Sequence, residues 1–217
     1  MPIRAIMFDL DGTLIDQFDA IHRTFSKVLV DMGYPAPSYE AVKKAVGGAS
    51  ENTMTKLIGK ERAPEAVQRL RPIFEKEMHI GLRALPGSME ILELCDQRKI
   101  KTCVLTNKHG PHARMVCDHL GFSKFLSFTL GANDTEWKKP DSKLSMLALK
   151  RLDSLPHETI YFGDSPYDYE TALNAGMISY LVATGTHSHE ELCSLNNVQV
   201  ETSIPSFIEN KFSSIFQ

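Results

Sequence analysis

Short runs of apolar residues recur along the chain, and the segments between them carry apolar residues at helical spacing. The runs predict buried strands at residues 3–8, 101–105, 128–131, 159–162 and 178–182. The intervening segments predict helices at residues 89–97, 112–120, 144–152 and 167–174. Strands that alternate with helices require right-handed crossovers. We therefore predict an α/β fold, a doubly wound parallel sheet of the Rossmann-like kind with helices on both faces.

The segment after the first strand departs from this alternation, because it reads as helical throughout before the next strand begins. Its apolar spacing and glycine breaks predict four helices, at residues 20–32, 39–46, 51–58 and 64–80. We interpret this block as an all-α helical cap inserted into the core. The predicted core comprises residues 1–16 and 85–217, and the predicted cap comprises residues 17–84.

Composition and charge narrow the classes of partner. The 24 Lys and Arg residues against 27 Asp and Glu residues give a net charge of -3, so no overall field draws the molecule to nucleic acid or to an anionic membrane. The chain contains no apolar run long enough to span a bilayer, and we expect a cytoplasmic monomer or homodimer. The four cysteines form no CxxC pair, and we expect buried, reduced thiols.

Two carboxylates end the first predicted strand in the sequence Phe-Asp-Leu-Asp-Gly-Thr, at Asp9 and Asp11. Ligands bind at the carboxyl ends of strands in an open parallel sheet. Two acids at this spacing repel each other, so they need a cation or a shared proton, and one can act as a nucleophile while the other moves a proton. A calcium loop is excluded because Leu14 and Ala20 stand where it needs glycine and glutamate. A solvated turn is the remaining alternative.

A second acidic pair, Asp164 and Asp168, ends another predicted strand. If Pro166 begins a helix, both carboxylates can face the same crevice. Carboxylate oxygens suit Mg2+, which accepts few protein ligands and keeps several waters. The alternative for Asp164 alone is an N-cap of that helix.

Two further groups complete the candidate chemistry. Thr106 and Asn107 end the strand predicted at residues 101–105, where a hydroxyl and an amide can hold phosphate oxygens. Lys139 precedes Pro140 and supplies a cation beside a rigid turn. Taken alone, Thr106 and Asn107 would be interpreted as a helix cap, and Lys139 with its neighbour Lys138 as a solvated pair.

In chain order, these four motifs resemble those of the haloacid dehalogenase superfamily, and the helical block resembles its cap. The resemblance covers residues 3 to about 185 and is greatest to the phosphoglycolate phosphatase-like subgroup. It implies that Asp9 attacks phosphorus and that Asp11 protonates the leaving oxygen and then activates water. It also implies that Thr106 and Asn107 hold the phosphoryl oxygens and that Lys139 offsets their charge.

The resemblance further implies a magnesium site. Mg2+ would be held by the Asp9 carboxylate, the Asp11 carbonyl and Asp164, and Asp168 would orient a metal-bound water or Lys139. The expected function is a Mg2+-dependent phosphatase for a small phosphorylated metabolite, through an aspartyl-phosphate intermediate. A sugar-phosphate mutase and a non-catalytic protein that binds a phosphorylated metabolite remain alternatives. In the mutase alternative, His22 is the nearby histidine of interest.

Overall fold

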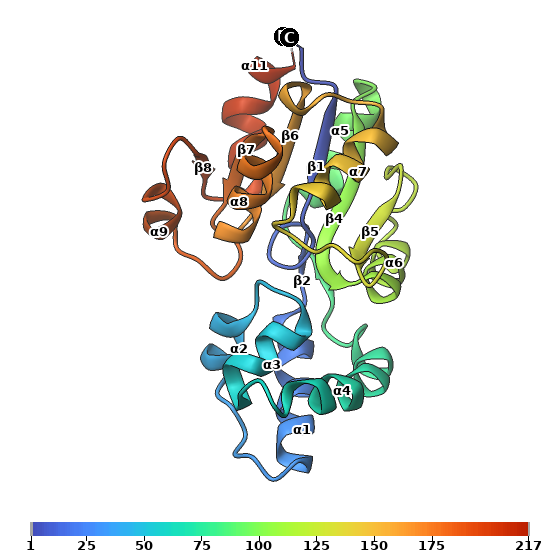
Figure 1. Cartoon of the computed structure of the whole chain (residues 1–217). Helices are drawn as coiled ribbons and strands as arrows, with labels where there is room; N and C mark the ends of the chain where they lie inside the picture. The colour runs from blue at the N-terminus through green and yellow to red at the C-terminus, as the bar shows by residue number, and fades with distance from the viewer. Residues whose placement is uncertain (1, 217) are drawn as a thin grey trace.

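The computed structural model describes residues 2–216 and contains a six-stranded parallel sheet (Figure 1). In spatial order its strands are β5 (Thr129–Ala132), β4 (Lys101–His109), β1 (Ala5–Phe8), β6 (Thr159–Gly163), β7 (Ile178–Val182) and β8 (Gln199–Glu201). Strand β1 lies in the middle because its register pairs it with β4 on one side and β6 on the other. The parallel sheet predicted from the apolar runs is confirmed.

Helices cover both faces of this sheet, and the alternation of side chains along β1 shows why. Ile6 and Phe8 pack into one apolar cluster, whereas Ala5 and Met7 pack into the other. The first cluster is covered by α5 (Ser88–Gln97), α6 (Gly110–His119), α10 (Ile204–Phe207) and the following π-helical turn η2 (Ile208–Phe212). The second is covered by α7 (Ser142–Leu152) and α8 (Pro166–Ala175). The strands are therefore buried on both sides, as apolar runs require.

Four helices are inserted after β1: α1 (Phe18–Asp31), α2 (Tyr39–Ala45), α3 (Ser50–Ile58) and α4 (Ala63–Glu77). They lie beyond the carboxyl end of the sheet (Figure 1). The chain enters and leaves them through a short antiparallel pair, β2 (Ile15–Asp16) and β3 (Arg83–Ala84). Arg83 reinforces this pair by donating from Nε and Nη2 to Asp16 Oδ2 at 3.0 and 2.7 Å.

The remaining elements are short. They are the 3-10 turn η1 (Pro156–Glu158), α9 (His189–Cys193) and α11 (Ser213–Ile215).

Two expectations from the sequence need adjustment. Strand β4 continues to His109 instead of ending at residue 105, with an irregular register beyond Leu105. The expectation of buried thiols is wrong for Cys193, which is exposed on α9, whereas Cys95, Cys103 and Cys117 are buried. None of the helices within residues 2–216 has the length and apolar character needed to cross a membrane.

Candidate active site

The site lies at the carboxyl edge of the three central strands. Asp9 follows β1, Thr106 lies near the end of β4, and Asp164 follows β6. Because β1 pairs in parallel with both neighbours, these three residues meet although they are far apart in the sequence. The Asp9 amide still donates to the Phe162 carbonyl at 2.9 Å, so the sheet itself holds the Asp9 backbone in place.

Lys139 is the cation of this site. Its Nζ lies 2.8 Å from Asp9 Oδ1 and 2.7 Å from Asp168 Oδ1, and its side chain is only 2% exposed. Burial opposes the charge, but the carboxylates of Asp168 and Asp9 hold the pKa of Lys139 well above its usual value. The lysine is therefore a fixed positive charge between two carboxylates.

Asn107 holds the backbone of Lys139. Its side-chain Nδ2 donates to the Lys139 carbonyl at 3.1 Å, and its Oδ1 accepts from the Lys139 amide at 2.9 Å. This reciprocal pair ties the loop between β5 and α7 to the end of β4. The side-chain amide that we expected to hold phosphate is thus engaged with Lys139.

Asp168 has its carboxylate oxygens fully occupied. Oδ1 bonds Lys139, while Oδ2 accepts from the Asp164 amide at 3.1 Å and from the Ser165 amide and hydroxyl at 3.1 and 2.6 Å. Ser165 and Asp168 form a capping box at the start of α8. Asp168 therefore orients Lys139 and the β6–α8 turn, and offers little to a ligand.

The side chain of Asp164 is oriented by Thr13, a residue of the first motif. Thr13 donates from Oγ1 to Asp164 Oδ1 at 2.9 Å, and the Thr186 amide lies 3.4 Å from Asp164 Oδ2. A Cβ at Gly185 would overlap the Asp164 carboxyl group, so the backbone needs glycine there. Burial raises the pKa of Asp164 well above its usual value, and the negative charges of Asp168 and Asp9 add to the shift.

The acidic cluster suits a hard divalent cation. Asp9, Asp164 and Asp168 each place a carboxylate oxygen within 4.8 Å of the others. Burial raises the pKa of Asp9 to about 6 despite the opposing charge of Lys139. Three buried carboxylates against one lysine leave excess negative charge, which a cation bound to oxygen ligands would offset. The residues present thus fit Mg2+.

Asp11 makes a separate contact, in the cleft between the core and the inserted helices. Lys108 Nζ lies 3.1 and 3.0 Å from its two carboxylate oxygens and donates to Gln17 Oε1 at 2.6 Å. The same ammonium lies 4.9 Å from the centre of the Phe74 ring. Lys108, Gln17 and Thr13 are site residues to which the sequence patterns gave no role. The only sequence feature that pointed to Lys108 is its position directly after Thr106 and Asn107.

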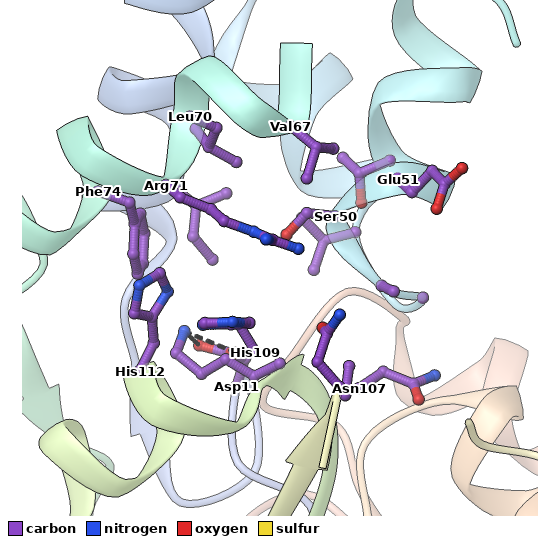
Figure 2. Close-up of a pocket in the computed structure, with 18 of the residues that line it drawn as sticks. Asp11, Ser50, Glu51, Val67, Leu70, Arg71, Phe74, Asn107, His109 and His112 are labelled. Atoms are coloured by element: carbon purple, nitrogen blue, oxygen red, sulfur yellow. Dashed lines mark hydrogen bonds and ion pairs between the residues drawn. The ribbon is translucent and has the colours of Figure 1, made fainter. Parts of the chain in front are cut away.

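A cleft beside Asp11 and Asn107 is lined by both parts of the chain. Figure 2 shows Val67, Leu70, Arg71 and Phe74 of α4 facing the core across the cleft, which on that side presents Asp11, Asn107, His109 and His112. The cavity measures about 840 Å³ including its wide mouth, which is open to solvent. A metabolite bound there would contact the inserted helices and the strand ends together.

Comparisons with known proteins point to one family of hydrolases. A family model described as haloacid dehalogenase-like hydrolase matches residues 6–182. The chain is 28% identical over 193 residues to a protein named probable phosphatase IndB from Dickeya dadantii (strain 3937), covering 86% of this chain and 84% of that one. It is also 28% identical over 181 residues to a phosphoglycolate phosphatase from Yersinia pestis, covering 80% and 78% of the two chains.

A solved structure shares the whole fold. The crystal structure of a putative phosphoglycolate phosphatase from Lactobacillus delbrueckii subsp. bulgaricus superposes with a TM-score of 0.89, covers 100% of this chain and 99% of its own, and is 19% identical. This likeness concerns the fold alone. The family model spans all four motifs and most of the chain, and the protein therefore belongs to the haloacid dehalogenase-like hydrolase family.

Proposed function

We propose that the protein is a Mg2+-dependent phosphatase that hydrolyses a small phosphorylated metabolite through an aspartyl-phosphate on Asp9. The observation that carries the proposal is the position of Asp9, whose carboxylate lies 2.8 Å from a buried lysine at the sheet edge, two residues before Asp11, which lines the open cleft. The enzyme class is that of a phosphoric monoester hydrolase, in line with the hydrolase family and the phosphatase names of its relatives.

In the first step, an Asp9 carboxylate oxygen attacks phosphorus and the bond from phosphorus to the leaving oxygen breaks. Asp11 gives that oxygen a proton, so that the product leaves as an alcohol. In the second step, Asp11 takes a proton from water as the water attacks phosphorus, and the acyl phosphate bond breaks to release phosphate and free Asp9. Lys139 keeps Asp9 ionised and offsets the charge of the phosphoryl oxygens.

Asp11 must change its contacts to take part. Its carboxylate is paired with Lys108 in this structure, and a carboxylate that is to donate a proton needs that pair to open. Substrate in the cleft offers Lys108 an alternative negative partner, because Asp11 and Lys108 both line the cavity.

Mg2+ would be held by the Asp9 carboxylate, the Asp11 carbonyl and Asp164. When bound, it supplies positive charge that stabilises the transferring phosphoryl group. Thr13 orients Asp164, and Asp168 orients Lys139. We assign Thr106 to the phosphoryl oxygens. The phosphate contact of Asn107 stays a prediction, because its side chain already supports Lys139.

We further propose that residues 17–84 act as a cap that closes over the core formed by residues 1–16 and 85–217. The two crossings between these parts are the paired strands β2 and β3, a narrow connection about which the inserted helices could turn. The mutase alternative receives no support from His22, whose Nε2 lies 3.1 Å from the Pro37 carbonyl and whose ring packs against Tyr39.

The test is phosphate release from a panel of small phosphorylated metabolites, including phosphoglycolate, pyrophosphate and sugar phosphates, with Mg2+ and with chelator. We expect release that requires Mg2+ and is abolished in Asp9→Asn. Undiminished release by Asp9→Asn would refute the covalent mechanism. Isomerisation of glucose phosphates without free phosphate would identify a mutase, and binding without either reaction would identify a sensor.

A further inference from the structure

Arg71 extends from helix α4 into the cleft without a counter-charge. Figure 2 shows its guanidinium in the cleft between Ser50 of α3 and His109 of the core. Within residues 2–216, no carboxylate oxygen lies within 4.0 Å of Arg71, and its side chain makes no hydrogen bond. A guanidinium is a planar fork of donors that matches a carboxylate or a phosphate. Its free position in the cleft therefore indicates an anionic ligand.

Two acidic groups near the cleft already have partners. Asp11 is paired with Lys108 at 3.0 Å, and Glu75 with His112 at 3.2 Å. Glu51 also lines the cleft, and both Glu51 and Arg71 are exposed. Within the part of the chain that the structure describes, Arg71 and the exposed Lys138 are cations of the cleft lining that have no carboxylate oxygen within 4.0 Å.

The core wall opposite Arg71 includes two histidines, His109 and His112. Burial is the main cause that lowers the pKa of His109, to about 4, and the charge of Arg71 adds to the effect. Burial also lowers the pKa of His112. The His109 ring is therefore uncharged at pH 7, and an uncharged imidazole has one N–H that can donate to an anion.

The transferring phosphoryl group does not need Arg71, because Lys139 lies directly against Asp9 at the sheet edge. On the other side, the cleft lining includes the apolar side chains of Val67, Leu70 and Phe74. A neutral leaving group would leave the arginine without a partner as it displaced water.

We propose that Arg71 binds a second anionic group, a carboxylate or a phosphate, on the leaving group of the substrate. The inference rests on the proposed phosphatase function and narrows its substrate class to phosphate esters that carry another negative charge. Arg71 is then a residue that determines specificity, whereas Lys139 and the acidic cluster serve any phosphate ester.

The experiment compares matched substrates with wild type, Arg71→Gln and Arg69→Gln, all with Mg2+. One pair is phosphoglycolate and 2-hydroxyethyl phosphate, which tests a carboxylate. The other is propane-1,3-diol bisphosphate and the corresponding monophosphate, which tests a phosphate. Arg69 is the matched control, because it lies on the same helix but bonds Glu65 at 2.6 Å on the surface.

We expect Arg71→Gln to lower kcat/KM for the charged member of one pair by about 10- to 150-fold, the range for a hydrogen bond to a charged group. The uncharged member and the Arg69→Gln variant should change less than about twofold. The pair that responds identifies the anion. Equal losses for both members would place Arg71 on the transferring phosphoryl group, and no loss would make it a solvated residue; either result overturns the proposal.

If wild type releases phosphate from none of these compounds, the proposed function fails while this inference can still be judged. Titration calorimetry with phosphoglycolate and with the bisphosphate then measures binding to wild type and to Arg71→Gln. Binding of one compound that weakens at least tenfold in Arg71→Gln supports the anion site. Equal binding by both proteins, or none by wild type, overturns it.

Discussion

Replacing Lys139 by Met should destabilise the protein strongly, because it leaves two buried carboxylates without their cation. The Lys139 ammonium lies 2.8 Å from Asp9 and 2.7 Å from Asp168, and the side chain is 2% exposed. Removing one partner of a buried charged pair costs about 3–5 kcal/mol. For a chain of this size, that corresponds to a fall in Tm of about 6–20 °C.

The assay is thermal unfolding with chelator at pH 7.5, so that no bound cation replaces the lysine. Lys27→Met is the matched control, since its ammonium lies 3.7 Å from Glu77 and its side chain is 57% exposed. An exposed pair of this kind contributes about 0–1 kcal/mol. Adding Mg2+ should recover part of the loss in Lys139→Met, because a cation bound to the acidic cluster stabilises the folded state.

A double-mutant cycle isolates the pairing itself. In Lys139→Met/Asp168→Asn, one of the carboxylates that lose their cation is also removed. The combined loss of stability should therefore be smaller than the sum of the two single losses by more than about 1 kcal/mol. The reasoning is refuted if Lys139→Met unfolds within 2 °C of wild type, about the shift of a surface pair, or if the two single losses add.

Three other predictions test neighbouring contacts. Thr13→Val removes the hydroxyl that donates to Asp164 at 2.9 Å, and Mg2+ affinity measured by calorimetry should fall about 10- to 100-fold; an unchanged affinity would mean that Thr13 does not orient a ligand. Lys108→Met removes the ammonium that holds Asp11, so kcat/KM for alkyl phosphates, whose leaving group needs a proton, should change more than for p-nitrophenyl phosphate; equal changes would contradict a link to Asp11. Burial raises the folded-state pKa of Asp9 to about 6, above the unfolded value of about 3.9, so the folded state binds more protons between these pH values. In chelator, the stability of wild type relative to Asp9→Asn, from urea unfolding, should therefore fall by up to about 3 kcal/mol as pH rises from about 4 to 6 and stay lower above; a flat difference would show that Asp9 titrates normally.

The strand ends were predictable because their signals are local. Asp9 and Asp164 each follow a short apolar run, and parallel strands in one sheet present their carboxyl ends at a common edge. Asn107 was predicted at this edge as well, but the bonds of its side chain were not. They join it to Lys139, 32 positions away, and such a contact depends on how the β5–α7 loop folds back.

Lys108 and Arg71 are residues whose positions at the site the sequence patterns did not predict. A lysine beyond a strand and an arginine on the polar side of a helix are ordinarily solvated, and only the position of Lys108 after Thr106 and Asn107 suggested otherwise. Lys108 finds its carboxylate at Asp11, 97 positions away, and Arg71 enters the cleft only because α4 packs across from β4 and α6. The exposure of Cys193 was missed for a similar reason, since α9 has only Leu192 buried.

The sequence by itself determined the alternation of strands and helices, the inserted helical block and the four motifs at strand ends, because hydrophobic periodicity and turn chemistry act over a few residues. Tertiary structure alone decided which side chains became partners: Lys139 between Asp9 and Asp168, Lys108 on Asp11, and Arg71 in the cleft. These contacts join segments distant in the chain, so their geometry and burial arise only when the inserted helices and the sheet pack together.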